Sequence, residues 1–163
     1  MIVDIEDNQT DLSIDAPSVE RLVLFMLDYL KLTGDEISIR FVSDEEMREL
    51  HADHFDDPAS TDCITFPIDL DETEEPAILG ICVICPQTAI EYAKKYKTDP
   101  YRELSLYLIH TLLHLKGYDD IEEEDRIEMK EQEVICMSAA EKEGLLLRDV
   151  RWILTIYPTC DNM

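Results

Sequence analysis

The sequence lacks any uninterrupted apolar run near the roughly 20 residues that a membrane-spanning helix requires. It begins without the basic start and apolar stretch of a secretory signal, so export is not expected. Internal repeats and low-complexity segments are also missing. With 163 residues, 45% of them hydrophobic, the chain can bury one substantial core. We therefore expect one domain over residues 1–163, in which residues 145–163 form a C-terminal extension that the pattern does not place.

A disulfide framework is missing as well. The five cysteines are odd in number and lie mostly in apolar segments, which favours buried free thiols in a reducing compartment and therefore a cytoplasmic protein. Cys82 and Cys85 have the spacing of a metal or redox motif. They fall in an expected strand, however, where side chains three apart face opposite ways, so we expect no shared site there.

Basic residues are scarce. Thirty-eight acidic residues against fourteen basic ones give a net charge of −24, which repels polyanions at long range and, taken alone, argues against nucleic-acid binding. Between residues 86 and 118 the balance is reversed, because five basic residues face only three acidic ones. These five are candidate contacts for a polyanionic substrate: Lys94, Lys95, Lys97, Arg102 and Lys116.

The apolar pattern predicts an α+β fold, in which helices pack on a small mixed sheet. Period-two alternation or continuous apolar runs predict strands at residues 1–6, 36–42, 63–68 and 77–85, the last covered on both faces. Helical periodicity and N-terminal signals predict helices at residues 18–32, 44–51, 86–96, 101–116 and 121–142. The acidic segment 69–76 is expected to be a solvated connection.

Several details of these helices can be tested. Gly34 is the expected end of the first helix, and Ser43–Glu46 has the pattern of a capping box at the start of the second. His51 and His54 are expected to be exposed residues of the loop region that follows the second helix. The last helix is expected to turn four apolar residues inward: Ile127, Val134, Ile135 and Met137.

Residues 101–116 are predicted to form a buried central helix. Asp99 and Pro100 are preferred at the cap and first helical position, and Gly117 is a natural left-handed stop. Apolar side chains cover most of the circumference of this segment, as in a helix that is buried on nearly all sides.

Two histidines on this helix have the spacing of metal ligands. His110 and His114 are four residues apart, so they project from one face, one turn apart. Because Gly117 lets the chain double back, Asp120 can return as a third ligand, and one position is left open for water. We therefore expect one zinc ion per chain, with the metal-bound water as nucleophile. Asp119 is an outer-shell candidate, and the general base is not identified.

Other functions are compatible with parts of this pattern. The histidines could merely satisfy hydrogen bonds in a buried helix, but unpaired buried imidazoles would cost about 1–3 kcal/mol each. A zinc protease would need a glutamate at the position of Thr111, and a hydroxyl cannot take a proton from zinc-bound water at neutral pH. Two histidines and a carboxylate could also hold ferrous iron in a hydrolase or oxygenase of small molecules.

Three motifs resemble those of the YbeY family. The string from His110 to Asp119 is similar to H-G-x-L-H-L-x-G-Y-D. Thr61–Pro67 is similar to T-D-V-L-S-F-P, and Leu79–Cys85 is similar to L-G-D-I-V-I-C. The match in order and spacing covers about residues 36–140, which is more specific than one short pattern.

This resemblance implies a zincin-like α+β fold with helices around a buried metal-binding helix. It also implies a zinc-dependent, single-strand-specific endoribonuclease in ribosomal RNA processing, ribosome maturation and quality control. The partners would be single-stranded or ribosomal RNA and the small ribosomal subunit, and Thr61 and Asp62 become candidate substrate contacts. The alternative is a ribosome-assembly factor with a structural metal and little nuclease activity.

The chain departs from the family pattern at four positions. Asp120 replaces the usual third histidine ligand, and a carboxylate is also a legitimate zinc ligand. Phe55 stands where many members carry an arginine, so a candidate phosphate-binding group is lost. Ile81 replaces an aspartate, and Thr111 replaces the glycine after the first histidine. These changes favour either local repacking or a weakened nuclease.

Overall fold

A computed structural model describes residues 1–55, 61–69 and 77–150 of the chain. Residues 56–60, residues 70–76 of the expected acidic connection, and residues 151–163 of the expected C-terminal extension lie outside the described residues. The elements follow the order β1 (Ile2–Asp7), α1 (Ala16–Tyr29), β2 (Glu36–Phe41), α2 (Asp44–Phe55), β3 (Cys63–Pro67), β4 (Ile78–Ile84), α3 (Pro86–Tyr96), α4 (Pro100–Lys116) and α5 (Glu123–Lys142).

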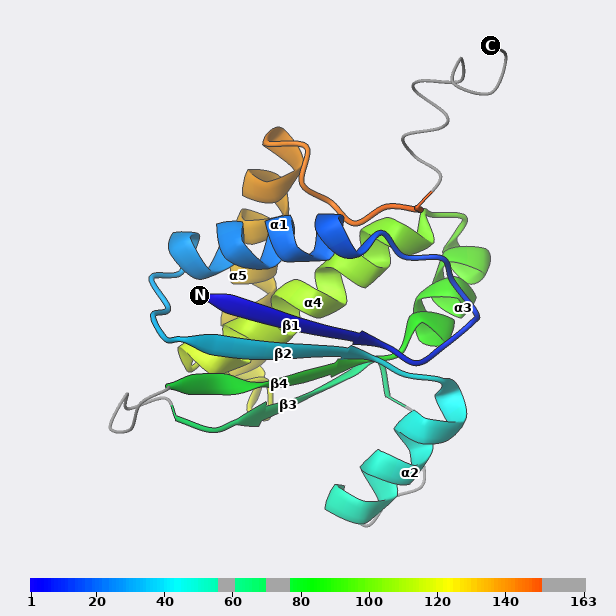
Figure 1. Cartoon of the computed structure of the whole chain (residues 1–163), viewed down its shortest axis with the longest axis horizontal. Helices are drawn as coiled ribbons and strands as arrows, with labels where there is room; N and C mark the ends of the chain where they lie inside the picture. The colour runs from blue at the N-terminus through cyan, green and yellow to red at the C-terminus, as the bar shows by residue number, and fades with distance from the viewer. Residues whose placement is uncertain (56–60, 70–76, 151–163) are drawn as a thin grey trace.

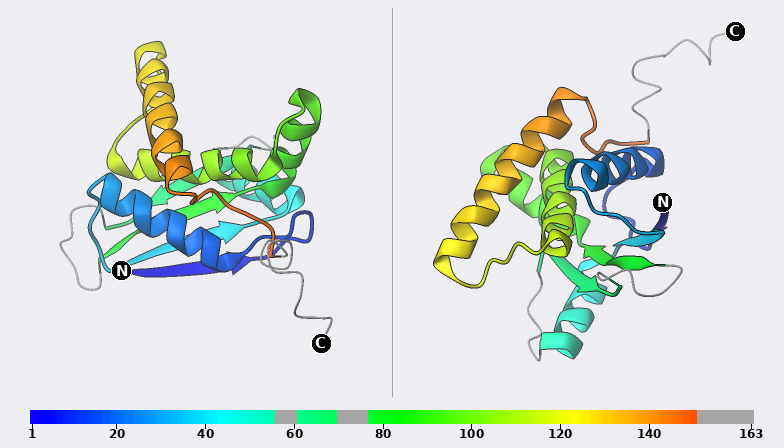
Figure 2. Two further views of the ribbon diagram at one scale, coloured as in Figure 1. Left: turned by 90° about the horizontal axis from the view of Figure 1, so that it is seen from above. Right: turned by 90° about the vertical axis from the view of Figure 1, so that its left-hand side faces the viewer.

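The strands form one mixed sheet in the order β1-β2-β4-β3 (Figure 1). β1, β2 and β4 are parallel, whereas β3 pairs antiparallel with β4. Helices α1, α4 and α5 gather on one side of the sheet, and α2 lies on the other (Figure 2). The expected α+β fold with helices around a central helix is therefore confirmed. Within the described residues, no helix is both long and apolar enough to span a membrane.

Helix α4 is the centre of the main core, as its composition predicts. The Asp99 side chain accepts a hydrogen bond from the backbone N–H of Tyr101 at 2.9 Å, and Gly117 ends the helix with a φ of 114°. Fully buried α4 side chains such as Leu108 and Leu112 pack in one cluster with residues of α1, β2 and β4. Because most side chains of α4 are packed in the core, the backbone of this helix is firmly placed, and so are the starting points of the side chains that face solvent.

The two faces of β4 contribute to different apolar clusters. Cys82 belongs to the main core, whereas Cys85 packs with Met47 of α2 in a smaller cluster on the other side of the sheet. The two cysteines thus belong to different apolar clusters, in agreement with the opposite directions expected from their spacing. The described cysteines are free, and burial raises the pKa of Cys82 to about 12, so its thiol stays protonated at neutral pH.

Two predicted helix ends were wrong. α1 ends at Tyr29 rather than at Gly34, and Lys31 takes the left-handed conformation with a φ of 56°. α2 begins as expected, with the Ser43 hydroxyl accepting a hydrogen bond from the N–H of Glu46 at 3.2 Å, but it continues past His51 to Phe55. His51 and His54 therefore lie on a helix, where His54 is exposed and His51 is half-buried.

The predicted inner face of α5 was also largely wrong. Ile127, Val134 and Ile135 are 56%, 66% and 46% exposed, and of the four predicted residues only Met137 is buried. The other buried residues of α5 are Met129, Cys136 and Ala140. Together with Met137 they form one stripe at helical spacing, whereas the four residues predicted from hydrophobicity alone spread over a wider arc of the helix.

Gly80 of β4 is required by the close approach of β3 and α4. A Cβ atom at this position would lie 2.7 Å from the backbone oxygen of Phe66 and 2.9 Å from Cδ2 of Leu115. Backbone cannot move aside cheaply, so Gly80→Ala is expected to lower the free energy of unfolding by about 1–3 kcal/mol in urea denaturation. The control Val134→Ala, at a position 66% exposed, should stay within about 0.5 kcal/mol of wild type. Equal stability of Gly80→Ala and wild type would contradict the tight contact.

Candidate metal centre

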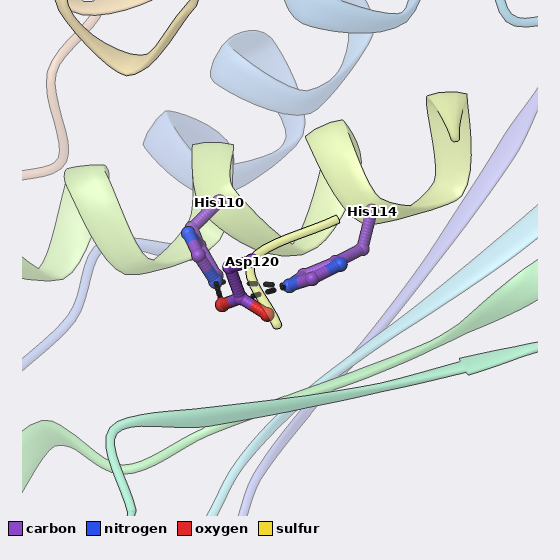
Figure 3. A group of neighbouring side chains, drawn as sticks. All are labelled: His110, His114 and Asp120. Atoms are coloured by element: carbon purple, nitrogen blue, oxygen red, sulfur yellow. Dashed lines mark hydrogen bonds and ion pairs between the residues drawn. The ribbon is translucent and has the colours of Figure 1, made fainter. Parts of the chain in front are cut away.

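His110, His114 and Asp120 converge on one point between α4 and the sheet (Figure 3). The Nε2 atoms of the two histidines are 3.0 Å apart. Oδ2 of Asp120 lies 3.3 Å from Nε2 of His110 and 3.5 Å from Nε2 of His114. The sequence therefore identified three side chains whose ligand atoms the structure brings together.

The spacing of these three atoms fits a tetrahedral ion. Zinc bonds of about 2.0–2.1 Å at tetrahedral angles place neighbouring ligand atoms about 3.3–3.4 Å apart. The observed separations of 3.0, 3.3 and 3.5 Å bracket that value. Two imidazoles and one carboxylate are also a donor set that zinc accepts in catalytic sites. The residues present thus fit a divalent ion, and among the described residues no fourth side chain joins them.

The turn after α4 delivers Asp120 to the site. Gly117 and Tyr118 donate backbone hydrogen bonds to the carbonyls of His114 and Leu113, at 3.0 and 3.1 Å, which closes the helix and reverses the chain. Asp119 is exposed and accepts a hydrogen bond from the backbone N–H of Asp120 at 2.8 Å. This contact holds the backbone of the third ligand, so Asp119 lies where an orienting residue is expected.

Glu133 of α5 contacts the opposite nitrogen of His110 and was missed from the sequence. Its Oε1 atom lies 2.7 Å from Nδ1 of His110, and the two side chains are 14% and 21% exposed. Burial would lower the pKa of His110, but the hydrogen bond and charge of Glu133, with the charges of Asp120 and Asp62, outweigh burial and raise that pKa above the usual value. Glu133 lies on the inward stripe of α5. A correct assignment of the inner face of that helix would therefore have identified Glu133 as a buried carboxylate.

The ligands line a cavity of about 560 Å³ that is open to solvent. Its wall includes Thr61 and Asp62, both expected as substrate contacts, and His51, which was expected to be an exposed loop residue. The remaining lining residues come mainly from β3 and the turn after α4: Cys63, Ile64, Thr65, Pro67, Gly117, Tyr118, Asp119 and Ile121. A cavity of this volume that opens to solvent allows a chain-like substrate to reach the ligand atoms.

The five basic candidates lie outside the described wall of this cavity. Three are exposed at the end of α3 or just after it: Lys94, Lys95 and Lys97. Arg102 forms a 2.6 Å ion pair with Glu141 of α5, and Lys116 is exposed at the end of α4. Their contact with a substrate stays a prediction. If they make such a contact, it lies outside the described cavity wall.

A sequence profile described as Endoribonuclease YbeY matches residues 4–141. The chain belongs to the YbeY family. A protein named Endoribonuclease YbeY from Protochlamydia amoebophila is 43% identical over 148 residues, which cover 91% of this chain and 99% of that protein. A protein with the same name from Chlamydia pneumoniae is 40% identical over 141 residues, covering 83% and 89%. The resemblance drawn from the three motifs is thereby confirmed.

The fold also agrees with a solved structure. A solution structure of a Thermotoga maritima protein superposes with a TM-score of 0.62 at 24% identity, covering 88% of this chain and 91% of that one. At this level of identity the likeness supports the fold alone.

The departures from the YbeY signature now have positions in the structure. Thr111 is fully buried and donates its hydroxyl to the carbonyl of Leu108 at 2.6 Å, so it does not face the cavity and offers no base for a protease. Ile81 packs against the smaller apolar cluster on the α2 side of the sheet, away from the described cavity wall. The side chain of Phe55 lies outside the described residues. Of the three departures whose side chains are described, Asp120 is the one that belongs to the candidate ligand set.

Proposed function

We propose that this YbeY family member is a zinc-dependent endoribonuclease that cleaves single-stranded RNA. The observation that carries the proposal is the convergence of three ligand atoms, from His110, His114 and Asp120, in a cavity open to solvent. The similar proteins named Endoribonuclease YbeY support the choice of RNA as substrate.

The ligand set would hold one ion per chain through Nε2 of each histidine and a carboxylate oxygen of Asp120. When bound, zinc would polarise a phosphoryl oxygen and lower the pKa of water, which suits phosphodiester hydrolysis at neutral pH. Asp119 holds the backbone of the third ligand, and Glu133 holds the ring of His110. These two contacts thus hold two of the three ligand residues, His110 and Asp120.

The residues of the cavity wall include groups that would suit single-stranded RNA. Thr61 can offer a hydroxyl, and Asp62 can accept hydrogen bonds from ribose hydroxyls or base amino groups. The exposed lysines of α3 would attract phosphates toward an otherwise acidic molecule. In the cell we place this activity in the cytoplasm, in the maturation and quality control of ribosomal RNA on the small subunit.

Two alternatives are less well supported. A ribosome-assembly factor with a structural metal would not need an open position beside the ion, because structural zinc sites are normally closed by four protein ligands. The names of the relatives also favour a nuclease. A ferrous oxygenase would use a similar ligand set, and metal analysis of anaerobically purified protein separates iron from zinc.

Removal of the metal is the direct test of the proposed activity. Protein treated with a chelator and dialysed should lose at least about 100-fold of its cleavage rate on single-stranded RNA, because water without a Lewis acid is a poor nucleophile at neutral pH. Added zinc should restore the rate, and a duplex of the same sequence should be cut more slowly. Stoichiometric zinc binding without any cleavage of single-stranded RNA would contradict the proposal.

A further inference from the structure

His110 is held by a carboxylate on the nitrogen that points away from the ligand cluster. Oε1 of Glu133 lies 2.7 Å from its Nδ1 atom, which is the separation of a strong, charge-assisted hydrogen bond. Glu133 comes from α5, whereas His110 comes from α4, so the contact joins two helices across their packed faces. Both side chains are largely buried, at 14% and 21% exposure, which limits competition from water.

This contact fixes which ring nitrogen carries the proton. A neutral imidazole has one donor and one acceptor nitrogen, and an ionised carboxylate can only accept. Nδ1 of His110 must therefore donate to Glu133, which leaves the lone pair on Nε2. Nε2 is the atom that lies 3.3 Å from Oδ2 of Asp120 and 3.0 Å from Nε2 of His114. The hydrogen bond thus presents the correct lone pair at the point where the ligands meet.

Within the described residues, His110 alone of the two histidines has such support. The hydrogen bond of His114 inside that part of the chain is made through Nε2, the nitrogen on the ligand side. The two histidines of α4 therefore differ: within the described residues, His110 has its Nδ1 atom held by a carboxylate, whereas no such contact is described for His114.

We propose that Glu133 is a positioning residue that holds His110 in the Nδ1–H tautomer and so raises the metal affinity of the centre. This inference rests on the metal site of the proposed function, but not on RNA as the substrate. Loss of such a carboxylate partner of a metal-binding histidine typically costs 10- to 100-fold in affinity. We expect a loss of about that size for Glu133→Ala, and a smaller loss for Glu133→Gln, whose amide oxygen can still accept the proton of Nδ1.

The test measures Zn²⁺ affinity of the full chain by competition with a chromogenic chelator. Glu131→Gln is the matched control, because Glu131 is exposed on the same helix and the change removes the same charge. It should leave the affinity within about twofold of wild type, whereas Glu133→Ala should lower it about 10- to 100-fold. Thermal unfolding of the metal-free proteins separates this effect from a general loss of structure.

A second measurement reads the tautomer itself. Nitrogen NMR of the metal-free protein, at a pH where the imidazoles are neutral, should show His110 protonated at Nδ1 in wild type and in Glu133→Gln. In Glu133→Ala the Nε2–H form should gain population. Unchanged Zn²⁺ affinity in Glu133→Ala, or an unchanged tautomer, would overturn the positioning role while leaving the metal centre intact. A wild-type chain that bound no Zn²⁺ would overturn both this inference and the proposed function.

Discussion

Replacing His114 by alanine is expected to abolish stoichiometric zinc binding and to reduce RNA cleavage by at least about 100-fold. Structural zinc sites are worth about 10–16 kcal/mol over four ligands, so one ligand contributes roughly 2.5–4 kcal/mol, or about 10²–10³-fold in affinity. The fold should survive, because the His114 side chain is 25% exposed at the cavity and does not fill the core. Metal analysis, an RNA-cleavage assay and circular dichroism of the same preparation test the three parts.

The matched control is His54→Ala. His54 is an exposed histidine of α2 whose ring packs at a tilt against that of Phe66, with ring centroids 4.7 Å apart, and it is not part of the described cavity wall. This variant should keep its zinc and its cleavage rate. If His114→Ala kept both as well, the ligand assignment would be wrong.

Asp120 gives the second large effect, because it is both a ligand and a departure from the YbeY signature. Asp120→Ala should lower zinc affinity by about 10²–10³-fold, by the same reasoning as for His114. The side chain is 42% exposed, so little stability should be lost. Asp120→His should keep the ion, because histidine is an equally good zinc ligand.

The histidine variant also tests how the carboxylate changes reactivity. A neutral ligand in place of a negative one leaves more positive charge on the metal complex, so it should polarise a phosphoryl oxygen more strongly. We therefore expect Asp120→His to cleave single-stranded RNA faster than wild type when zinc is saturating. A rate as low as that of Asp120→Ala, with zinc bound, would show that the site is built around the shorter side chain.

Features that depend on neighbouring residues could be predicted from the sequence. The caps of α4 at Asp99 and Gly117 are local, since each needs only a few residues to form its hydrogen bonds. The common direction of His110 and His114 follows from helix geometry alone. The return of Asp120 follows from the turn at Gly117, which lies between His114 and Asp120. For these reasons the sequence could predict that His110, His114 and Asp120 come together, as the structure shows.

Features that depend on how helices pair could not be predicted. α5 carries apolar residues around much of its surface, so hydrophobicity did not reveal that Met129, Cys136 and Ala140 form the packed stripe. The same error hid Glu133, which reaches His110 only because that stripe faces α4. His51 was missed because it was expected to be an exposed residue of the loop region, whereas it lies on α2 and lines the cavity.

All three ligands fall within residues 110–120, across the end of one helix. Helix ends fray more readily than helix centres, because their last carbonyls lack partners within the helix. An ion shared by His114 in the last turn of α4 and by Asp120 beyond it would clamp this weak end. Metal loss would then loosen a single turn and its connecting loop, while the sheet beneath kept its order.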